Sequence, residues 1–336
     1  EGQPMKKFLA VLLTLALCVT MLALPAMAEE KKTPSICIVV AGTLGDRSFY
    51  DSANEGIEKL KADYGTDIKV IECREDASLY ESSLIDAAEV CDVIAAVGWQ
   101  FAEALPTVAE ELPEKQFLFI DNVMNGSLEN EMSIVYAQNE GSFLVGYIAG
   151  KLSKTGKVGV VGGQDSETIN DFIVGYEAGA KYANPDCAVE VQYANDFEDP
   201  AKGKECALAL YGLGCDIVYQ VAGKTGEGVF EAAAETGNYA IGVDGDQKYI
   251  NPDVIICSMV KQVGKSIYDT VSDMDTYFAG GTVWTADMST GYIDVVYGDD
   301  TMTQQVSDEL KAEVEDIKTK IISGEIEVPT VRNLAE

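Results

Sequence analysis

The feature that most constrains this sequence is a repeated alternation of short apolar runs with amphipathic stretches of helical period. Continuous apolar runs fit strands that are buried on both faces, which occur in parallel sheets covered by helices. We therefore predict an α/β protein with two doubly wound parallel sheets. The predicted strands are 35–41, 67–72, 92–97, 116–121, 133–136, 157–162, 188–193, 215–221, 239–244 and 254–258. The predicted helices are 49–64, 79–89, 101–111, 139–152, 168–183, 200–213, 225–236, 260–278 and 304–323.

The alternation falls into two successive series, which predict two lobes. The segment near 137–140 separates the series and is the expected first crossover between the lobes. In open α/β sheets, ligands bind outside the carboxyl ends of the strands, where the strand order reverses. We therefore expect a ligand in a cleft that the two lobes share.

The N-terminal residues resemble an export signal. Lys6 and Lys7 precede the apolar stretch from Phe8 to Leu24, and small residues end at Ala28. We predict a signal peptide over residues 5–28, cleaved after Ala28. An uncleaved membrane anchor is the alternative, but the apolar stretch is shorter than the about 20 residues of a spanning helix. Cys18 follows Leu17 rather than a small residue, so we do not expect a lipid anchor there.

Charge and composition exclude several functions. Acidic residues outnumber basic ones by 56 to 24, giving a net charge of −32, which should repel nucleic acid and anionic membrane surfaces. The chain contains no histidine, so imidazole bases and most common zinc sites are excluded. The cysteines are widely spaced without a CxxC pair, and we expect neither a metal nor a cofactor.

Polar and glycine-rich blocks follow several predicted strands. Asp121 ends the fourth strand, and four longer blocks stand out: Asp46-Arg47-Ser48-Phe49, Gly223-Lys224-Thr225-Gly226, Gly242-Val243-Asp244-Gly245-Asp246-Gln247 and Ser258-Met259-Val260-Lys261. In this order and spacing, the blocks resemble those of the basic membrane protein family. That family comprises extracytoplasmic solute-binding proteins, among them the PnrA-like nucleoside receptors of ABC importers.

The resemblance runs from about residue 35 to 329 and implies a type I periplasmic-binding fold with the ligand enclosed at the hinge. We assign residues 33–137 and about 259–284 to an N-terminal lobe, and 138–258 and about 285–336 to a C-terminal lobe. The family further implies a nucleoside ligand, favouring a purine, and delivery to ABC permease subunits in the membrane. We expect a monomer located in the periplasm or at the cell surface.

The resemblance also assigns roles to single residues. Phe49 and Phe197 would stack on the base, because aromatic rings pack against the π faces of a nucleobase. The remaining residues would bind the base edge or the sugar: Asp46 near the base, Asp121 at base or sugar, Asp244 at the ribose hydroxyls, Lys261 at the sugar, and Gly223 and Gly226 through backbone amides. Taken singly, each carboxylate is more often a helix cap, a turn residue or a solvated charge, and each phenylalanine is at least as often a core residue.

Two of these blocks depart from the family pattern, and one further aromatic residue stands at a strand end. Tyr50 replaces an amide that often follows the stacking phenylalanine, and Lys224 stands where a glycine is usual. Trp99 follows a predicted strand, where it would line the cleft or pack on a helix. Two other functions remain alternatives: binding of a free sugar by the same fold, and hydrolysis of nucleosides by an exported enzyme that uses the aspartates with a metal.

Overall fold

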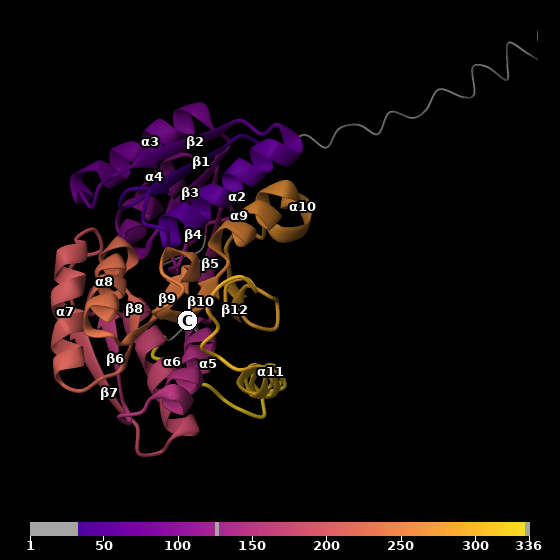
Figure 1. Ribbon diagram of the computed structural model, residues 1–336. Coiled ribbons are helices and arrows are strands. Elements are labelled where there is room, and N and C mark those ends of the chain that lie inside the picture. Colours follow the sequence, from indigo (N-terminus) through magenta and orange to yellow (C-terminus); the bar gives the residue numbers. More distant parts are fainter. Residues whose placement is uncertain (1–32, 125–127, 333–336) are drawn as a thin grey trace, which may run out of the picture. The chain divides into compact units, whose positions relative to one another are not determined.

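The computed structural model describes residues 33–124 and 128–332. The predicted signal peptide at 5–28, with Cys18, lies outside the described residues. Two six-stranded sheets form, in the orders β11-β5-β4-β3-β1-β2 and β12-β10-β9-β8-β6-β7, with helices packed around each (Figure 1). The predicted α/β fold with two doubly wound lobes is confirmed. We call the first sheet with its helices the N-terminal lobe and the second the C-terminal lobe.

The N-terminal lobe is built mainly from the first half of the chain. Its strands are β1 (Ile36–Val40), β2 (Ile68–Glu72), β3 (Val93–Val97), β4 (Gln116–Ile120), β5 (Glu131–Tyr136) and β11 (Thr282–Ala286), and all their pairings are parallel. Its helices are α2 (Phe49–Tyr64), α3 (Tyr80–Val90), α4 (Ala104–Glu111), α9 (Val263–Ser272) and α10 (Met274–Tyr277), with 3₁₀ turns η1 (Ala77–Leu79) and η2 (Trp99–Ala102).

The C-terminal lobe repeats this plan. Its strands are β6 (Lys157–Gly162), β7 (Ala188–Tyr193), β8 (Ile217–Val221), β9 (Tyr239–Asp244), β10 (Ile255–Lys261) and β12 (Ile293–Val296). Its helices are α5 (Gln138–Leu152), α6 (Glu167–Ala183), α7 (Pro200–Gly212), α8 (Glu227–Thr236) and α11 (Asp308–Ile322), with 3₁₀ turns η3 (Gly223–Gly226) and η4 (Lys248–Ile250). Strand β12 runs antiparallel to β10, which differs from the all-parallel expectation.

The two sheets place a strand-order reversal at equivalent points. In the orders β2-β1-β3 and β7-β6-β8, the reversals fall between β1 and β3 and between β6 and β8. The chain passes between the lobes three times: from β5 to α5, from β10 to α9, and from β11 to β12. Ligand sites of doubly wound sheets lie at such reversals. A ligand site is therefore expected at the carboxyl ends of these strands.

Two sequence expectations are wrong in the last strands of the chain. The predicted strand 254–258 continues to Lys261, so the following helix begins at Val263 and not at 260. Strands β11 and β12 were not predicted, because β11 is an exposed edge strand of mixed polarity and β12 has only four residues. Neither strand carries the continuous apolar run that marks a buried strand.

Helices α5 and α6 pack backbone to backbone. This contact fixes the position of α6, which forms part of the wall that the C-terminal lobe contributes to the pocket described below. A Cβ atom on Gly179 would lie 1.9 Å from the carbonyl oxygen of Phe143, and one on Gly146 would lie 2.2 Å from that of Tyr176. Only glycine permits this approach. In the described part of the chain, no helix is both long and apolar enough to span a membrane.

Candidate functional site

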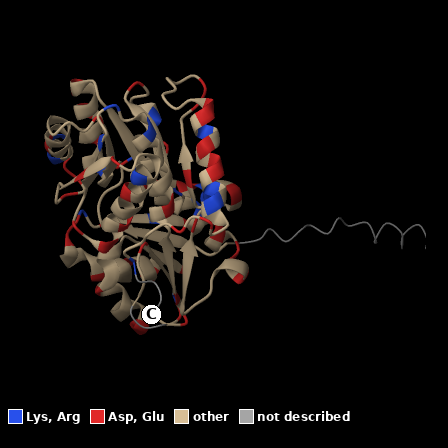
Figure 2. Ribbon diagram, turned by 90° about the horizontal axis from the view of Figure 1, so that it is seen from below, with Lys and Arg blue, Asp and Glu red and all other residues tan. Residues whose placement is uncertain are grey.

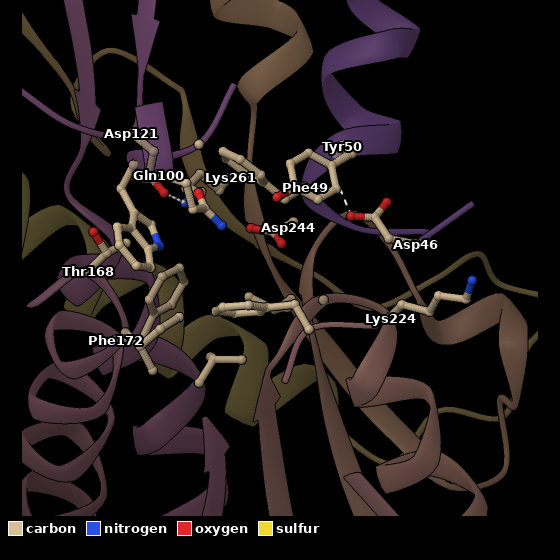
Figure 3. Close-up of a pocket in the computed structure, with 17 residues that line it drawn as sticks. Asp46, Phe49, Tyr50, Gln100, Asp121, Thr168, Phe172, Lys224, Asp244 and Lys261 are labelled. Carbon is tan, nitrogen blue, oxygen red and sulfur yellow. Dashed lines mark hydrogen bonds and ion pairs between the residues drawn. The ribbon is translucent and has the colours of Figure 1, made fainter. Parts of the chain in front are cut away.

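A pocket lies where the carboxyl ends of strands from both lobes converge (Figure 3). Its empty volume is about 600 Å³, counted to its opening to solvent. Most of the residues singled out from the sequence line it: Asp46, Phe49, Tyr50, Trp99, Asp121, Phe197, Gly223, Asp244 and Lys261. Gly226 does not line the pocket, because its Cα faces the buried side chain of Gln220.

Asp46 holds the start of helix α2. Its Oδ1 accepts hydrogen bonds from the backbone N–H groups of Ser48 and Asp51, both at 3.0 Å, and its Oδ2 accepts one from Tyr50 at 2.9 Å. Burial raises the pKa of Asp46 to about 7, while these three donors act to lower it. The carboxylate thus caps the helix and orients the first turn, which carries Phe49 (Figure 3).

The two phenylalanines enter the pocket from opposite lobes. Phe49 begins α2 in the N-terminal lobe, and Phe197 lies in the loop between β7 and α7 of the C-terminal lobe. The ring of Phe197 covers Gly163, where a Cβ atom would lie 2.0 Å from Cε1. That glycine follows β6 at the strand-order reversal. The ring therefore needs a residue without a side chain beneath it.

A buried ion pair forms the polar centre of the pocket. Lys261 Nζ donates to Asp121 Oδ2 at 2.7 Å, and the two side chains are 2% and 6% exposed. The same ammonium lies 4.7 Å from the ring centroid of Phe49, 5.2 Å from that of Tyr136 and 5.0 Å from that of Phe172. Aromatic faces stabilise a cation that has been removed from water.

Asp244 offers the clearest vacant bonding position. Its Oδ2 accepts a hydrogen bond from Ser48 Oγ of the other lobe at 2.5 Å, whereas its buried Oδ1 has no partner. Burial raises the pKa of Asp244, and the nearby Lys261 ammonium acts to lower it. The residue has a positive φ of 64°, a strained conformation that persists where the surroundings impose it.

Contacts outside the pocket hold the lobes together over it. Glu198, next to Phe197, accepts from the Thr43 backbone N–H at 3.0 Å and from Thr43 Oγ1 at 2.7 Å. Gln247 Nε2 of the C-terminal lobe donates to the carbonyl oxygen of Arg47 at 3.0 Å. We call the pair of bonds from Thr43 to Glu198 the lobe latch. These bonds bring the two lobes into contact beside the pocket, and we call this arrangement the closed form.

The two departing residues and Trp99 take different positions. Tyr50 is buried, and its hydroxyl donates to Glu75 Oε1 at 3.4 Å. Lys224 lines the pocket on the side of Glu198, with 3.8 Å between its Nζ and Oε2 of Glu198. Trp99 lines the pocket in the turn after β3.

Sequence reasoning missed part of the lining and its support. Gln100, Thr168, Ile169 and Phe172 line the pocket, and Arg332 contacts Asp121 without lining the pocket itself. Thr168 and Phe172 lie in a helix that was correctly predicted, but periodicity does not reveal which of its residues reach a cleft. Arg332 follows the last helix in a segment without any local motif, so the sequence carries no signal for it.

The described residues contain no group of three or more acidic or cysteine side chains arranged to hold a metal ion. All cysteines within residues 33–124 and 128–332 are free thiols, most of them buried: Cys37, Cys73, Cys91, Cys187, Cys206, Cys215 and Cys257. Burial raises the pKa of Cys37 to about 12, so it stays a thiol.

Comparison with known proteins gives consistent matches. A family model described as "ABC transporter substrate-binding protein PnrA-like" matches residues 33–332. The chain is 34% identical to basic membrane protein A of Borreliella burgdorferi over 304 residues, covering 88% of each chain. It is also 34% identical over 313 residues to the ABC transporter nucleoside-binding protein BmpA of Lactococcus lactis, covering 86% of this chain and 87% of that protein.

A solved structure shares the fold over nearly the same length. An ABC transporter solute-binding protein from Aeropyrum pernix superposes with a TM-score of 0.80 at 27% sequence identity. The match covers 89% of this chain and 94% of that one.

Proposed function

The chain belongs to the PnrA-like family of ABC transporter substrate-binding proteins, and on this premise we propose that it captures a nucleoside outside the cytoplasm. The closed lobes then deliver the nucleoside to an ABC permease in the membrane. The protein itself acts as a monomer and catalyses no reaction. The predicted signal peptide and the similarity to a relative named as nucleoside-binding support this proposal.

The observation that carries the ligand class is the vacant Oδ1 of Asp244 in a pocket lined with aromatic rings. A buried carboxylate oxygen without a donor is costly, so the bound ligand should supply one. A ribose hydroxyl is such a donor. The flat base next to it would lie between Phe49 and Phe197, which enter from opposite lobes. A two-ring purine offers the larger surface for this stacking.

The remaining roles follow from the hydrogen-bond donors and acceptors that each group has not already used within the protein. Lys261 has donors left after its bond to Asp121 and would give one to the sugar. The backbone at Gly223 would approach the ribose, and Trp99 and Tyr50 would close the sides of the pocket. We propose that Asp46 and Asp121 act by holding Phe49 and Lys261 in place, because protein donors already occupy their oxygens.

Isothermal titration of the purified protein with adenosine, guanosine, inosine, uridine, ribose and free adenine tests the proposal. We expect nucleosides to bind, purines more tightly than uridine, with no release of base on prolonged incubation. Ribose bound as tightly as a nucleoside would favour the sugar-binding alternative. Release of free base would instead show a nucleoside hydrolase. Native mass spectrometry of the freshly purified protein identifies any ligand retained from the cell.

A further inference from the structure

The chain returns to the pocket after its last helix. Residues 328–332, which we call the C-terminal segment, pass along α5 and α6 of the C-terminal lobe. Asn139 Nδ2 donates to the carbonyl oxygen of Pro329 at 3.2 Å. Asp171 Oδ1 accepts from Thr330 Oγ1 at 2.6 Å and from the backbone N–H of Val331 at 3.2 Å. These bonds fasten the segment beside the helix that carries Phe172.

The segment ends at a buried arginine that crosses to the N-terminal lobe. Arg332 Nη2 donates to the carbonyl oxygen of Asp121 at 3.1 Å, and its Nη1 lies 3.5 Å from Asp121 Oδ1. The arginine side chain is 4% exposed. One guanidinium therefore contacts both the backbone and one carboxylate oxygen of Asp121, and Lys261 binds the other carboxylate oxygen.

Asp121 needs such support because its backbone is strained. Its φ is +71°, in the left-handed region that residues with a side chain rarely adopt. A conformation of this kind persists only where neighbours impose it. The N–H of Asp121 donates to the carbonyl oxygen of Ile134 at 2.8 Å, and Arg332 binds the carbonyl oxygen on the other side.

Arg332 also adds a second buried cation beside Asp121. The carboxylates of Asp121 and Asp244 and the cations of Lys261 and Arg332 are all at most 8% exposed. Without the guanidinium, Lys261 would be the cation shared by two buried carboxylates. Removing one partner from a buried charged group leaves an uncompensated charge, which is strongly unfavourable.

We propose that Arg332 is a positioning residue of the ligand site, and that the C-terminal segment is therefore part of that site. Arg332 holds Asp121, and Asp121 holds the Lys261 ammonium in reach of the ligand. Because the segment is fastened to the C-terminal lobe and Arg332 binds the N-terminal lobe, the segment also ties the two lobes in the closed form. The proposal rests on the proposed function in taking this pocket as the ligand site.

Calorimetric titration of three variants with the tightest-binding purine nucleoside tests the proposal. Arg332→Met removes the guanidinium and should raise Kd by about 10- to 100-fold. Arg332→Lys keeps the charge but cannot bind both oxygens of Asp121 at once, so its Kd should fall between those of wild type and Arg332→Met. Arg74→Met, which removes an exposed arginine, is the matched control and should bind like wild type. A Kd of Arg332→Met within about twofold of wild type would overturn the proposal.

A second measurement separates this inference from the proposed function. Hydrogen exchange of the Asp121 amide in the ligand-free protein should be faster in Arg332→Met than in Arg74→Met. If the wild type binds no nucleoside, the proposed function fails, but the exchange rate still reports whether Arg332 positions Asp121. Equal exchange in both variants would overturn the positioning role. If Arg332→Met does not fold, both the Kd and the exchange rate of the Asp121 amide are measured on Arg332→Lys instead.

Discussion

Single oxygen atoms distinguish the carboxylates of this pocket. Asp46, Asp121 and Asp244 all lie at or beyond the end of a strand, so their positions in the sequence do not separate their roles, and all three are buried. In the structure, the oxygens of the first two are engaged by protein donors, whereas Asp244 keeps one oxygen free. At the scale of the residue, a carboxylate whose oxygens already accept from protein donors supports the pocket, whereas one with a free oxygen can bind the ligand.

Replacement of Asp244 by asparagine tests this distinction. The amide can still accept from Ser48 but loses the charged acceptor, so affinity for a nucleoside should fall by about 10- to 100-fold. Affinity for the free base should change little, because the base does not contact this oxygen in our proposal. Titration of both ligands into wild type and Asp244→Asn gives the comparison. An equal loss for nucleoside and base would place Asp244 at the base instead.

A buried glutamate far from the pocket predicts a pH effect on stability. Glu131 in β5 is 2% exposed and accepts from Ser133 Oγ, and burial raises its pKa to about 7. The folded protein then holds a proton that the unfolded chain releases near pH 4.3. The resulting stabilisation is complete below that pH and is lost as the pH rises through about 7.

Glu131→Gln cannot ionise and should not lose this stability. The free energy of unfolding of the variant, relative to wild type, should rise by on the order of 2 kcal/mol between pH 4.5 and pH 8. Urea denaturation at the two pH values measures it. Glu129→Gln, at an exposed position two residues earlier, is the control. A difference that does not vary with pH would contradict the raised pKa.

At the scale of the element, the sequence predicted most of the fold. Buried strands such as β1 and β3 have five consecutive apolar residues, and helix α2 begins and ends where its pattern indicates. Strands β11 and β12 escaped prediction because one is exposed and the other short. The end of β10 was misplaced because Lys261 is polar, although a buried ion pair accommodates it in the strand. A local pattern does not show a partner 140 residues away.

The close packing of α5 and α6 predicts a large effect of one methyl group. In Gly179→Ala, the new Cβ would collide with the backbone of α5, so the helices must separate at a cost of about 2 kcal/mol or more. Gly212→Ala is the matched control, since a Cβ there meets no atom within 4 Å. Thermal denaturation of both variants should show a clearly lower Tm for Gly179→Ala alone. Similar values would mean that the helices can separate freely.

At the scale of the whole molecule, the proposed function requires two lobes that close. The family similarity predicted this arrangement, and the lobe boundaries assigned from the sequence remain our proposal. The sequence did not show which residues hold the lobes together, because Thr43 and Glu198 are 155 positions apart and neither belongs to a motif. Contacts of this kind depend on the relative placement of two separately folded sheets.

Loss of the lobe latch should affect the rate of ligand release. Thr43→Val removes the hydroxyl bond to Glu198 and leaves the backbone bond, so the closed form should lose about 1 kcal/mol. Stopped-flow measurements should then show faster nucleoside dissociation by about fivefold, with little change in the preference among nucleosides. Thr319→Val, where the hydroxyl bonds within α11, is the control. An altered preference would mean that Thr43 contacts the ligand.

The exterior of the molecule is strongly acidic, whereas charges of both signs lie close together at the pocket. Acidic residues are spread over the helices and loops of both lobes, and account for a net charge of −32 (Figure 2). At the pocket, the buried carboxylates of Asp121 and Asp244 lie near the buried cations of Lys261 and Arg332. An uncharged solute that enters the pocket disturbs neither set, and dissolved ions screen exposed charges far more than buried ones. Such a receptor should bind its solute with similar affinity in fresh water and in brine.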